Sequence, residues 1–361
     1  MGFTAKKLLI NRLLSSRQNL FAWGQNSFGQ LGDGTTVSKS SPVQIGTLSW
    51  SQVVSGTRSL AIRSDGLLFA WGYNVVGQLG DGTVVDKSSP VQIGALSWSQ
   101  VAGSPYHSLA IRSDGLLFAW GYNSSGQLGD GTTVNKSSPV QIGSLSWGQV
   151  SAEGNQTQAI RNDGRLFAWG YNGFGQLGDG TIVNKSSPVQ IGALLWSQVS
   201  VSLYYTQAIR SDGRLFTWGR NNFGQLGDGT TVNKSSPVQI GALSWNKIAG
   251  ISYHSLAIRS DGLLFAWGYN PAGQLGDGTI VNKSSPVQIG SLSWGQVSAG
   301  GNHSLAIRSN GLLFAWGYNG GGQLGDGTVV DKSSPVQIGA LSWTQVSAGQ
   351  NNSLGLLGFS I

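Results

Sequence analysis

Short apolar runs separated by polar, glycine-rich segments recur along the chain with a period of 49 residues, shortened once to 48. Within residues 84–123, four runs have strand composition: "PVQIG", "WSQVAG", "HSLAIRS" and "LLFAWG". The last two are separated by Asp114-Gly115, a dipeptide typical of a tight hairpin with a positive φ. We therefore predict four β-strands in each repeat.

Seven such repeats predict an all-β fold, a seven-bladed β-propeller of four-stranded blades. Trp-Gly pairs mark the seven units, and a second column of seven tryptophans accounts for the rest of the 14. Strand alternation should place Leu109 and Ile111 on one side of a blade and Ala110 on the other. The repeat thus assigns the tryptophans to the scaffold.

The polar stretch "GQLGDGTTVNKSSPVQIG" from Gly126 is expected to cross from one blade's last strand to the next blade's first. Its glycines suit a sharp turn that runs close to a neighbouring backbone. Its aspartate should accept hydrogen bonds from nearby amides in an Asx-type turn. That column consists of Asp33, Asp81, Asp130, Asp179, Asp228, Asp277 and Asp326.

The two ends of the chain are expected to complete one blade together. The first repeat supplies only a last strand and the final repeat only the preceding ones, so residues 20–23 should pair with residues 353–357 and leave no open edge. The predicted domains are a propeller, residues 18–361, and an arm, residues 1–17. The arm can form a short amphipathic helix and dock on the propeller or another subunit through Phe3, Lys6, Lys7, Leu8, Leu9, Arg12 and Leu13.

Composition narrows the function classes. Charged residues make up only 10% of the chain, and cysteine is absent, which excludes disulfides and thiolate metal sites. Of the net charge of +7, four charges lie in the arm, and the rest of the chain has 18 basic against 15 acidic residues. Nucleic-acid binding is therefore not expected. No apolar run is long enough for a membrane span, and the N-terminus does not fit a conventional signal peptide.

Candidate catalytic groups all fall in repeat columns. His107, His254 and His303 share one column with arginine, glutamine, tyrosine and asparagine, and we expect them to be blade-loop residues. The chain has a single glutamate, so no acid–base pair stands out, and we predict no enzymatic activity, cofactor, metal or small-molecule substrate. A lysine column could form a cationic rim, although single surface lysines usually serve solubility; it consists of Lys39, Lys87, Lys136, Lys185, Lys234, Lys283 and Lys332.

Departures from the repeat are concentrated between residues 153 and 251. Aromatic and arginine side chains on the loops of a rigid scaffold are typical of protein-binding hot spots. The alternative is neutral drift among duplicated units, and the sequence leaves both open. The candidate partner-binding residues are Tyr204, Tyr205, Arg214, Arg220, Phe174, Phe223, Glu153, Tyr106 and Tyr253.

The pattern "HSLAIRSDGLLFAWGYNSSGQLGDGT" resembles the repeat of the regulator of chromosome condensation family, whose members form seven-bladed propellers. The name-giving member is an exchange factor for the small GTPase Ran that binds nucleosomes, and other members are bacterial and phage proteins. The near-identity of the units resembles the bacterial and phage members, and no insertion resembles the exchange factor's GTPase-contacting wedge.

This resemblance implies a non-enzymatic structural or protein-binding propeller that acts with other subunits of an assembly. A phage virion component, such as a capsid, neck or tail decoration, is the leading expectation, which would place the protein in the cytoplasm before assembly. A host- or surface-binding module is the next, and the alternative is a guanine-nucleotide exchange factor or chromatin-binding propeller.

Overall fold

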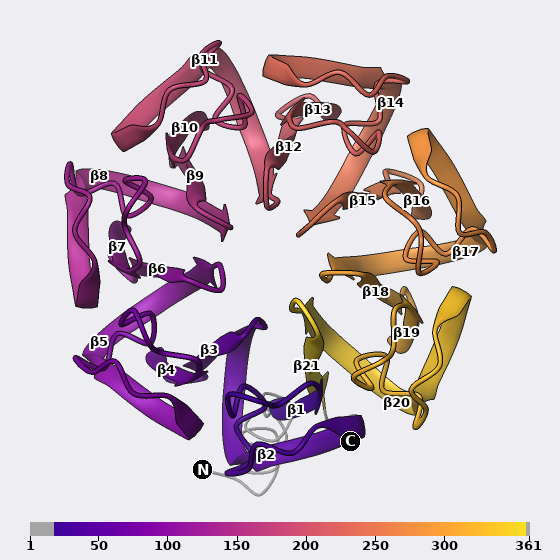
Figure 1. Cartoon of the computed structure of the whole chain (residues 1–361), viewed down its shortest axis with the longest axis horizontal. Helices are drawn as coiled ribbons and strands as arrows, with labels where there is room; N and C mark the ends of the chain where they lie inside the picture. The colour runs from indigo at the N-terminus through magenta and orange to yellow at the C-terminus, as the bar shows by residue number, and fades with distance from the viewer. Residues whose placement is uncertain (1–17, 359–361) are drawn as a thin grey trace, which may run out of the picture.

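The structure, a computed structural model, describes residues 18–358, and β-strands are the regular elements of this part of the chain. Figure 1 shows the strands arranged in a ring of blades around one axis. Long strands of 16 to 18 residues recur once per repeat: β2 (Lys39–Val54), β5 (Lys87–Gly103), β8 (Lys136–Glu153), β11 (Lys185–Val201), β14 (Lys234–Gly250), β17 (Lys283–Ala299) and β20 (Lys332–Ala348).

Between successive long strands lie two short ones. They are β3 (Arg58–Arg63) and β4 (Leu67–Gly72), β6 (His107–Arg112) and β7 (Leu116–Gly121), β9 (Gln156–Arg161) and β10 (Arg165–Gly170), β12 (Tyr205–Arg210) and β13 (Arg214–Gly219), β15 (His254–Arg259) and β16 (Leu263–Gly268), and β18 (His303–Arg308) and β19 (Leu312–Gly317). The ends of the described chain are β1 (Gln18–Gly24) and β21 (Asn352–Gly358).

Each long strand serves two blades. The first half of β5 pairs with β4 as far as Ser97, and its second half pairs with β6 from Trp98 onward, both antiparallel. A blade therefore consists of the second half of one long strand, two short strands and the first half of the next long strand. The prediction of seven four-stranded blades is confirmed, although two of the four predicted runs form one continuous bent strand.

The position of the blade crossing differs from the prediction. The loop that contains Gly126 joins β7 to β8, and β8 returns to pair with β7, so the loop stays within one blade. The crossing occurs instead at the bend of the long strand. The predicted close approach is present: a Cβ on Gly126, whose φ is +78°, would lie 2.5 Å from Cα of Ser186 in the next blade. Only glycine fits this position.

The two chain ends close the ring in one blade. Strand β1 pairs antiparallel with β21 in continuous register, with Leu20 opposite Leu356 and Trp23 opposite Ser353. Strand β1 also pairs with the first half of β2, and β21 with the second half of β20. The predicted closure is therefore confirmed. The predicted arm, residues 1–17, lies outside the described residues.

The hydrophobic core lies between neighbouring blades. Leu109 and Ile111 pack with Trp147 on one side of their blade, whereas Ala110 packs with Trp98 and Trp120 on the other. This is the alternation that the sequence predicts. Trp120, which belongs to the first tryptophan column, donates its indole N–H at 3.0 Å to the backbone carbonyl of Gln78 in the preceding blade. Equivalent layers between other blades make a rigid frame.

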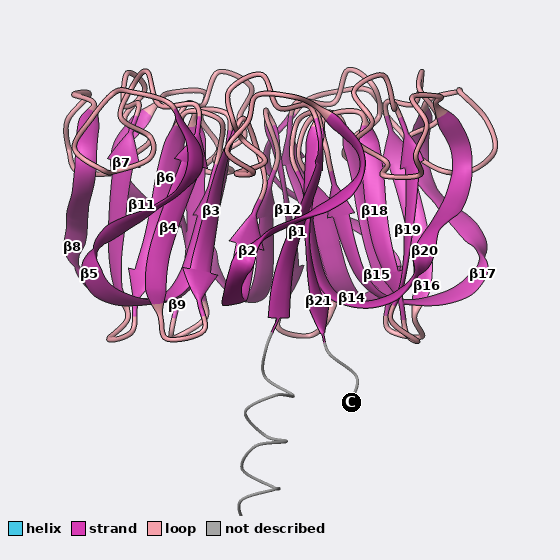
Figure 2. Ribbon diagram, turned by 90° about the horizontal axis from the view of Figure 1, so that it is seen from below, coloured by secondary structure: helices cyan, strands magenta, loops and turns pink. Residues whose placement is uncertain are grey.

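The strands run along the ring axis, so each blade has two ends, which Figure 2 shows as the two faces of a disc. One face carries the long loops that precede the long strands and the short loops that lead into β3, β6 and their equivalents; we call it the loop face. The opposite face carries the hairpin turns, such as that at Gly115, whose φ is +91°; we call it the turn face.

Candidate functional site

Five of the residues predicted to bind a partner lie together on the loop face. They are Phe174, Tyr204, Arg220, Phe223 and Tyr253, and they come from three consecutive blades. The ring centroids of Phe174 and Tyr204 are 5.2 Å apart, and those of Phe223 and Tyr253 are 5.5 Å apart. The rings of Tyr204 and Tyr253 join the two pairs at 6.3 Å. The sequence departures therefore meet in space.

Two further tyrosines extend this group at its ends. Tyr171 lies 6.2 Å from Phe174, and Tyr269 lies 4.6 Å from Phe223, measured between ring centroids. The sequence analysis missed both because tyrosine is the usual letter of their column. All seven side chains are partly exposed. We call Tyr171, Phe174, Tyr204, Arg220, Phe223, Tyr253 and Tyr269 the loop-face cluster.

Arg220 occupies the middle of the loop-face cluster. Its guanidinium carbon lies 5.1 Å from the ring centroid of Phe174, 5.4 Å from that of Tyr204 and 5.6 Å from that of Tyr253. Each distance is within the range of a cation–π contact. Five other repeats have tyrosine at this column, so the arginine introduces a charge into a mostly aromatic column.

Tyr205 does not belong to an exposed patch, contrary to the grouping proposed from the sequence. Its side chain is fully buried, and its hydroxyl donates a hydrogen bond of 2.6 Å to the backbone carbonyl of His254. Burial raises the pKa of Tyr205 to about 12, which keeps the hydroxyl protonated as a donor. Its role is to join two neighbouring blades.

Two other predicted residues lie away from the loop-face cluster. Arg214 begins β13 next to the hairpin turn, and its guanidinium donates to the carbonyl of Ala242. At about 3.3 Å per residue, it lies about 17 Å from the loop-face end of β13. Tyr106 is exposed on the loop face but packs on Tyr122, with centroids 6.2 Å apart, outside the network of the cluster.

Glu153 is buried where loops from different blades meet at the ring axis. Its carboxylate accepts a hydrogen bond of 3.1 Å from Nε2 of Gln350, a residue almost 200 positions further along the chain. The side-chain oxygen of Gln350 also lies 3.4 Å from the hydroxyl of Ser252, which donates to it. Glu153 therefore contributes to closing the loop-face end of the axis and is not available to a partner on the surface.

The charge of Glu153 is poorly compensated. Burial raises its pKa to about 8, against the opposing effects of the Gly154 amide and of Arg58. Burial likewise lowers the pKa of Arg58 to about 9. The guanidinium of Arg58 donates to the carbonyl of His107 at 2.9 Å, and no ion pair joins it to Glu153. Desolvation therefore dominates over the attraction between these two groups.

The histidine column is structural. Residues of this column begin β6, β15 and β18 and are fully buried, so the expectation that they are loop residues is wrong. His107, His254 and His303 each place Nε2 2.9–3.0 Å from a hydroxyl of the next blade. Burial lowers the pKa of each to about 3, which keeps the rings neutral. They join blades, as Tyr205 does.

The lysine column does not form a free cationic rim. Each lysine pairs at 3.3–3.7 Å with the loop aspartate of its own repeat, six residues earlier. The same aspartates accept from the amide two residues on, as predicted, for example from Thr132 to Asp130 at 3.0 Å. A spacing of six residues between Asp and Lys in every repeat is the signal that could have predicted this pairing.

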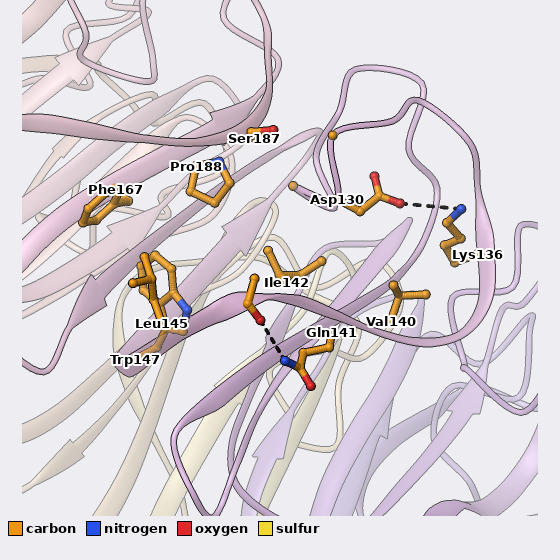
Figure 3. Close-up of a pocket in the computed structure, with 13 residues that line it drawn as sticks. Asp130, Lys136, Val140, Gln141, Ile142, Leu145, Trp147, Phe167, Ser187 and Pro188 are labelled. Carbon is orange, nitrogen blue, oxygen red and sulfur yellow. Dashed lines mark hydrogen bonds and ion pairs between the residues drawn. The ribbon is translucent and has the colours of Figure 1, made fainter.

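Pockets of about 600 Å³ open on the outer wall between blades. Figure 3 shows one of them, bordered by the Asp130–Lys136 ion pair, with Leu145 and Trp147 at its apolar side. The carboxamide of Gln141 donates to the carbonyl of Gly143 at 2.8 Å beside it. The lining residues have the same identity in all seven repeats, so these pockets are a property of the repeated wall.

Across the described residues, no three side chains of histidine, aspartate or glutamate are grouped so that they could hold a metal ion. Within residues 18–358, none of the elements is a helix that could cross a bilayer.

Comparison with solved structures gives several similar propellers. The chain is similar to human WBSCR16, with a TM-score of 0.87 and 22% identity over 95% of this chain and all of that one. It is similar to Prp20p from Saccharomyces cerevisiae, with a TM-score of 0.84 and 22% identity over 96% of this chain and 92% of that one. These likenesses show the fold. No curated protein sequence matches the chain.

Two family models match the sequence itself. The model of the regulator of chromosome condensation (RCC1) repeat matches residues 19–62 and 65–111. The model of the RCC1-like domain matches residues 97–355, well over half of the chain. The resemblance inferred from the repeat is thereby confirmed, and the similarity to bacterial and phage members stays a prediction. The chain belongs to the RCC1-like domain family of β-propellers.

Proposed function

We propose that this chain is a non-enzymatic protein-binding propeller and that the loop-face cluster is its partner site. The observation that carries the proposal is that seven partly exposed aromatic and arginine side chains from three consecutive blades form one contact network. A few residues supply most of the binding energy at protein interfaces, and aromatic residues and arginine are enriched among them. Blades outside these three have small or polar residues at several equivalent positions, such as Ser125 and Asn302.

Relatives support a binding role in general. The solved structures include Prp20p, described with its binding to Gsp1p and histones, and Kap60 bound to yeast RCC1. We extend from these only the use of the propeller as a binding scaffold. None of the relatives named above is a phage assembly, so the virion role, the surface-binding role and the arm as an assembly device stay predictions.

No observation favours the alternative of GTPase exchange or chromatin binding. In residues 18–358, the loop from the third to the fourth strand has the same length in every blade, as from Gly72 to Lys87 and from Gly121 to Lys136. A wedge inserted between these strands would lengthen one of them. The identity of about a fifth to Prp20p supports a shared fold only.

The repeat supplies variants that test the proposed site without disturbing the scaffold. Three substitutions each introduce a residue that another repeat has at the same column: Phe174→Ser, Tyr204→Asn and Phe223→Ala. We expect the triple variant to keep its thermal stability and to lose at least tenfold in capture of proteins from an extract of the source organism, measured by quantitative mass spectrometry.

Tyr106→Asn is the matched control, because it removes an exposed tyrosine of the same column outside the cluster. Proteins that depend on the cluster should be captured equally by the control and the original chain. Equal capture by the triple variant would contradict the proposal.

A further inference from the structure

The loop-face cluster also indicates what kind of partner it fits. Resting on the proposed function, we infer that the cluster binds an acidic polypeptide segment, in which a carboxylate contacts Arg220 and a neighbouring apolar side chain packs on the aromatic rings. Arg220 is the residue that determines this preference, and the rings around it supply the apolar contact.

Arg220 is held in place before any partner arrives. Its guanidinium lies over three rings at 5.1–5.6 Å, which restricts the rotamers that a free arginine would sample. A side chain that is already ordered loses less entropy on binding. Its Nε–H is buried and has no acceptor among the described residues, so the terminal amino groups are the ones that can reach an anion.

The charge of Arg220 is uncompensated, unlike that of most cations in the propeller. The lysines of the repeat column pair with loop aspartates, and Arg112 and four of its equivalents pair with the aspartate of the hairpin turn, as Arg112 does with Asp114. Arg220 has no carboxylate within 4 Å in the described chain. A positive charge on an aromatic surface favours a partner that supplies the missing carboxylate.

A polypeptide fits these observations better than a nucleic acid. Binding to a phosphate backbone gains its affinity from several cations, and this cluster has one. The rings also meet edge to face or tilted, as Phe174 and Tyr204 do at an interplanar angle of 66° and Tyr204 and Tyr253 at 37°, so they do not form a stack of parallel surfaces for successive bases. A carboxylate beside an apolar side chain needs one cation and a partly exposed aromatic surface.

The test uses two peptides that differ only in charge. Each fluorescein-labelled peptide has ten residues; in one, glutamate alternates with leucine and phenylalanine, and in the other, glutamine replaces each glutamate. Fluorescence anisotropy with the full chain should give a dissociation constant about three- to tenfold lower for the glutamate peptide. This preference should weaken as sodium chloride rises from about 50 to about 500 mM.

Arg220→Tyr is the decisive variant, because tyrosine stands at this column in five other repeats and keeps the surface aromatic. We expect it to bind the two peptides equally, and Arg220→Lys to keep part of the preference. If Arg220→Tyr retains the full preference, or if the original chain binds both peptides equally, the inference is overturned. A twelve-nucleotide oligothymidylate that binds more tightly than the glutamate peptide would also overturn it.

The outcomes separate this inference from the proposed function. Equal binding of both peptides that is lost in the Phe174→Ser, Tyr204→Asn and Phe223→Ala variant would leave the site in place and remove the preference for acidic partners. Failure of both peptides to bind at 1 mM overturns the inference about the partner, and the capture experiment then decides on the site itself.

Discussion

Glu153→Gln should stabilise the protein at neutral pH, by an amount that grows as pH rises. The Glu153 side chain is 2% exposed, and its carboxylate accepts a hydrogen bond from Gln350. A glutamine can still accept that bond through its amide oxygen. The variant therefore removes a titratable group while it keeps the contact that closes the axis.

The magnitude follows from the shift in pKa. Burial raises the pKa of Glu153 from 4.5 to about 8, so folding favours the protonated acid. The contribution of Glu153 is fully present below pH 4.5 and is lost as pH rises toward 8. At about 1.4 kcal/mol per pH unit, the loss is about 3 kcal/mol at pH 7 and about 4 kcal/mol at pH 8.

The assay is urea denaturation of both proteins at pH 5, 6, 7 and 8, with the free energy of unfolding compared at each pH. Comparing the two proteins cancels the buried histidines, whose lowered pKa values give the opposite trend over part of this range. Asp163→Asn is a control, because it removes an exposed acid at a column where another repeat has Asn310. Its difference from the original chain should not change over this range.

A difference between Glu153→Gln and the original chain that is the same at pH 5 and pH 8 would refute the reasoning. It would mean that the carboxylate is ionised in the folded protein throughout, so that Arg58 or solvent compensates its charge. Stabilisation at pH 5 alone would have the wrong sign and would exclude burial as the cause.

Three further predictions concern the scaffold. Gly126→Ala should lower the free energy of unfolding by more than about 2 kcal/mol in urea denaturation, because its Cβ would meet the backbone of the next blade. Gly143→Ala has open space around its Cβ, so in the same assay it should lower the free energy of unfolding by only about 1 kcal/mol, from its positive φ. Trp120→Phe should cost about 1 kcal/mol more than Trp98→Phe in the same assay, because only Trp120 donates its indole N–H to a carbonyl. Deleting residues 352–361 removes β21, and the burial of its two fully buried leucines contributes about 3–6 kcal/mol to the stability of the fold. The deletion should therefore abolish cooperative thermal unfolding, measured by circular dichroism.

The repeat made most of the fold predictable. Hairpin turns, the alternation of Leu109 and Ala110, and the closure of the ring follow from local patterns repeated seven times and from strand pairing rules. The bend of the long strand was not predictable in the same way, because the runs "PVQIG" and "WSQVAG" have the composition of two separate strands. Whether a turn or a bend joins them depends on how neighbouring blades pack.

The candidate site was predictable in part, for a related reason. Departure from the repeat picks out Arg220 and Phe174 but carries no information on burial, so Tyr205 and Glu153 were grouped with them. Glu153 lies three residues before β9, and Tyr205 is the first residue of β12. Neighbouring loops and blades cover the chain at both places. Tyr269 is the opposite case: it is the residue that most repeats have at its column, and it belongs to the site only because Phe223 lies beside it.

The same repetition gives an argument about where binding can evolve in this chain. A residue such as Trp120 contacts a neighbouring blade through its buried indole, and its column is tryptophan in all seven repeats. A residue such as Arg220 contacts loop side chains only, and tyrosine, glutamine and arginine all occur at its column. The tryptophan column that joins blades is therefore invariant, whereas the loop-face column of Arg220 varies from blade to blade. Adjacent blades that carry aromatic side chains at several loop-face columns are for that reason the part of the ring where a partner site can form without loss of the frame.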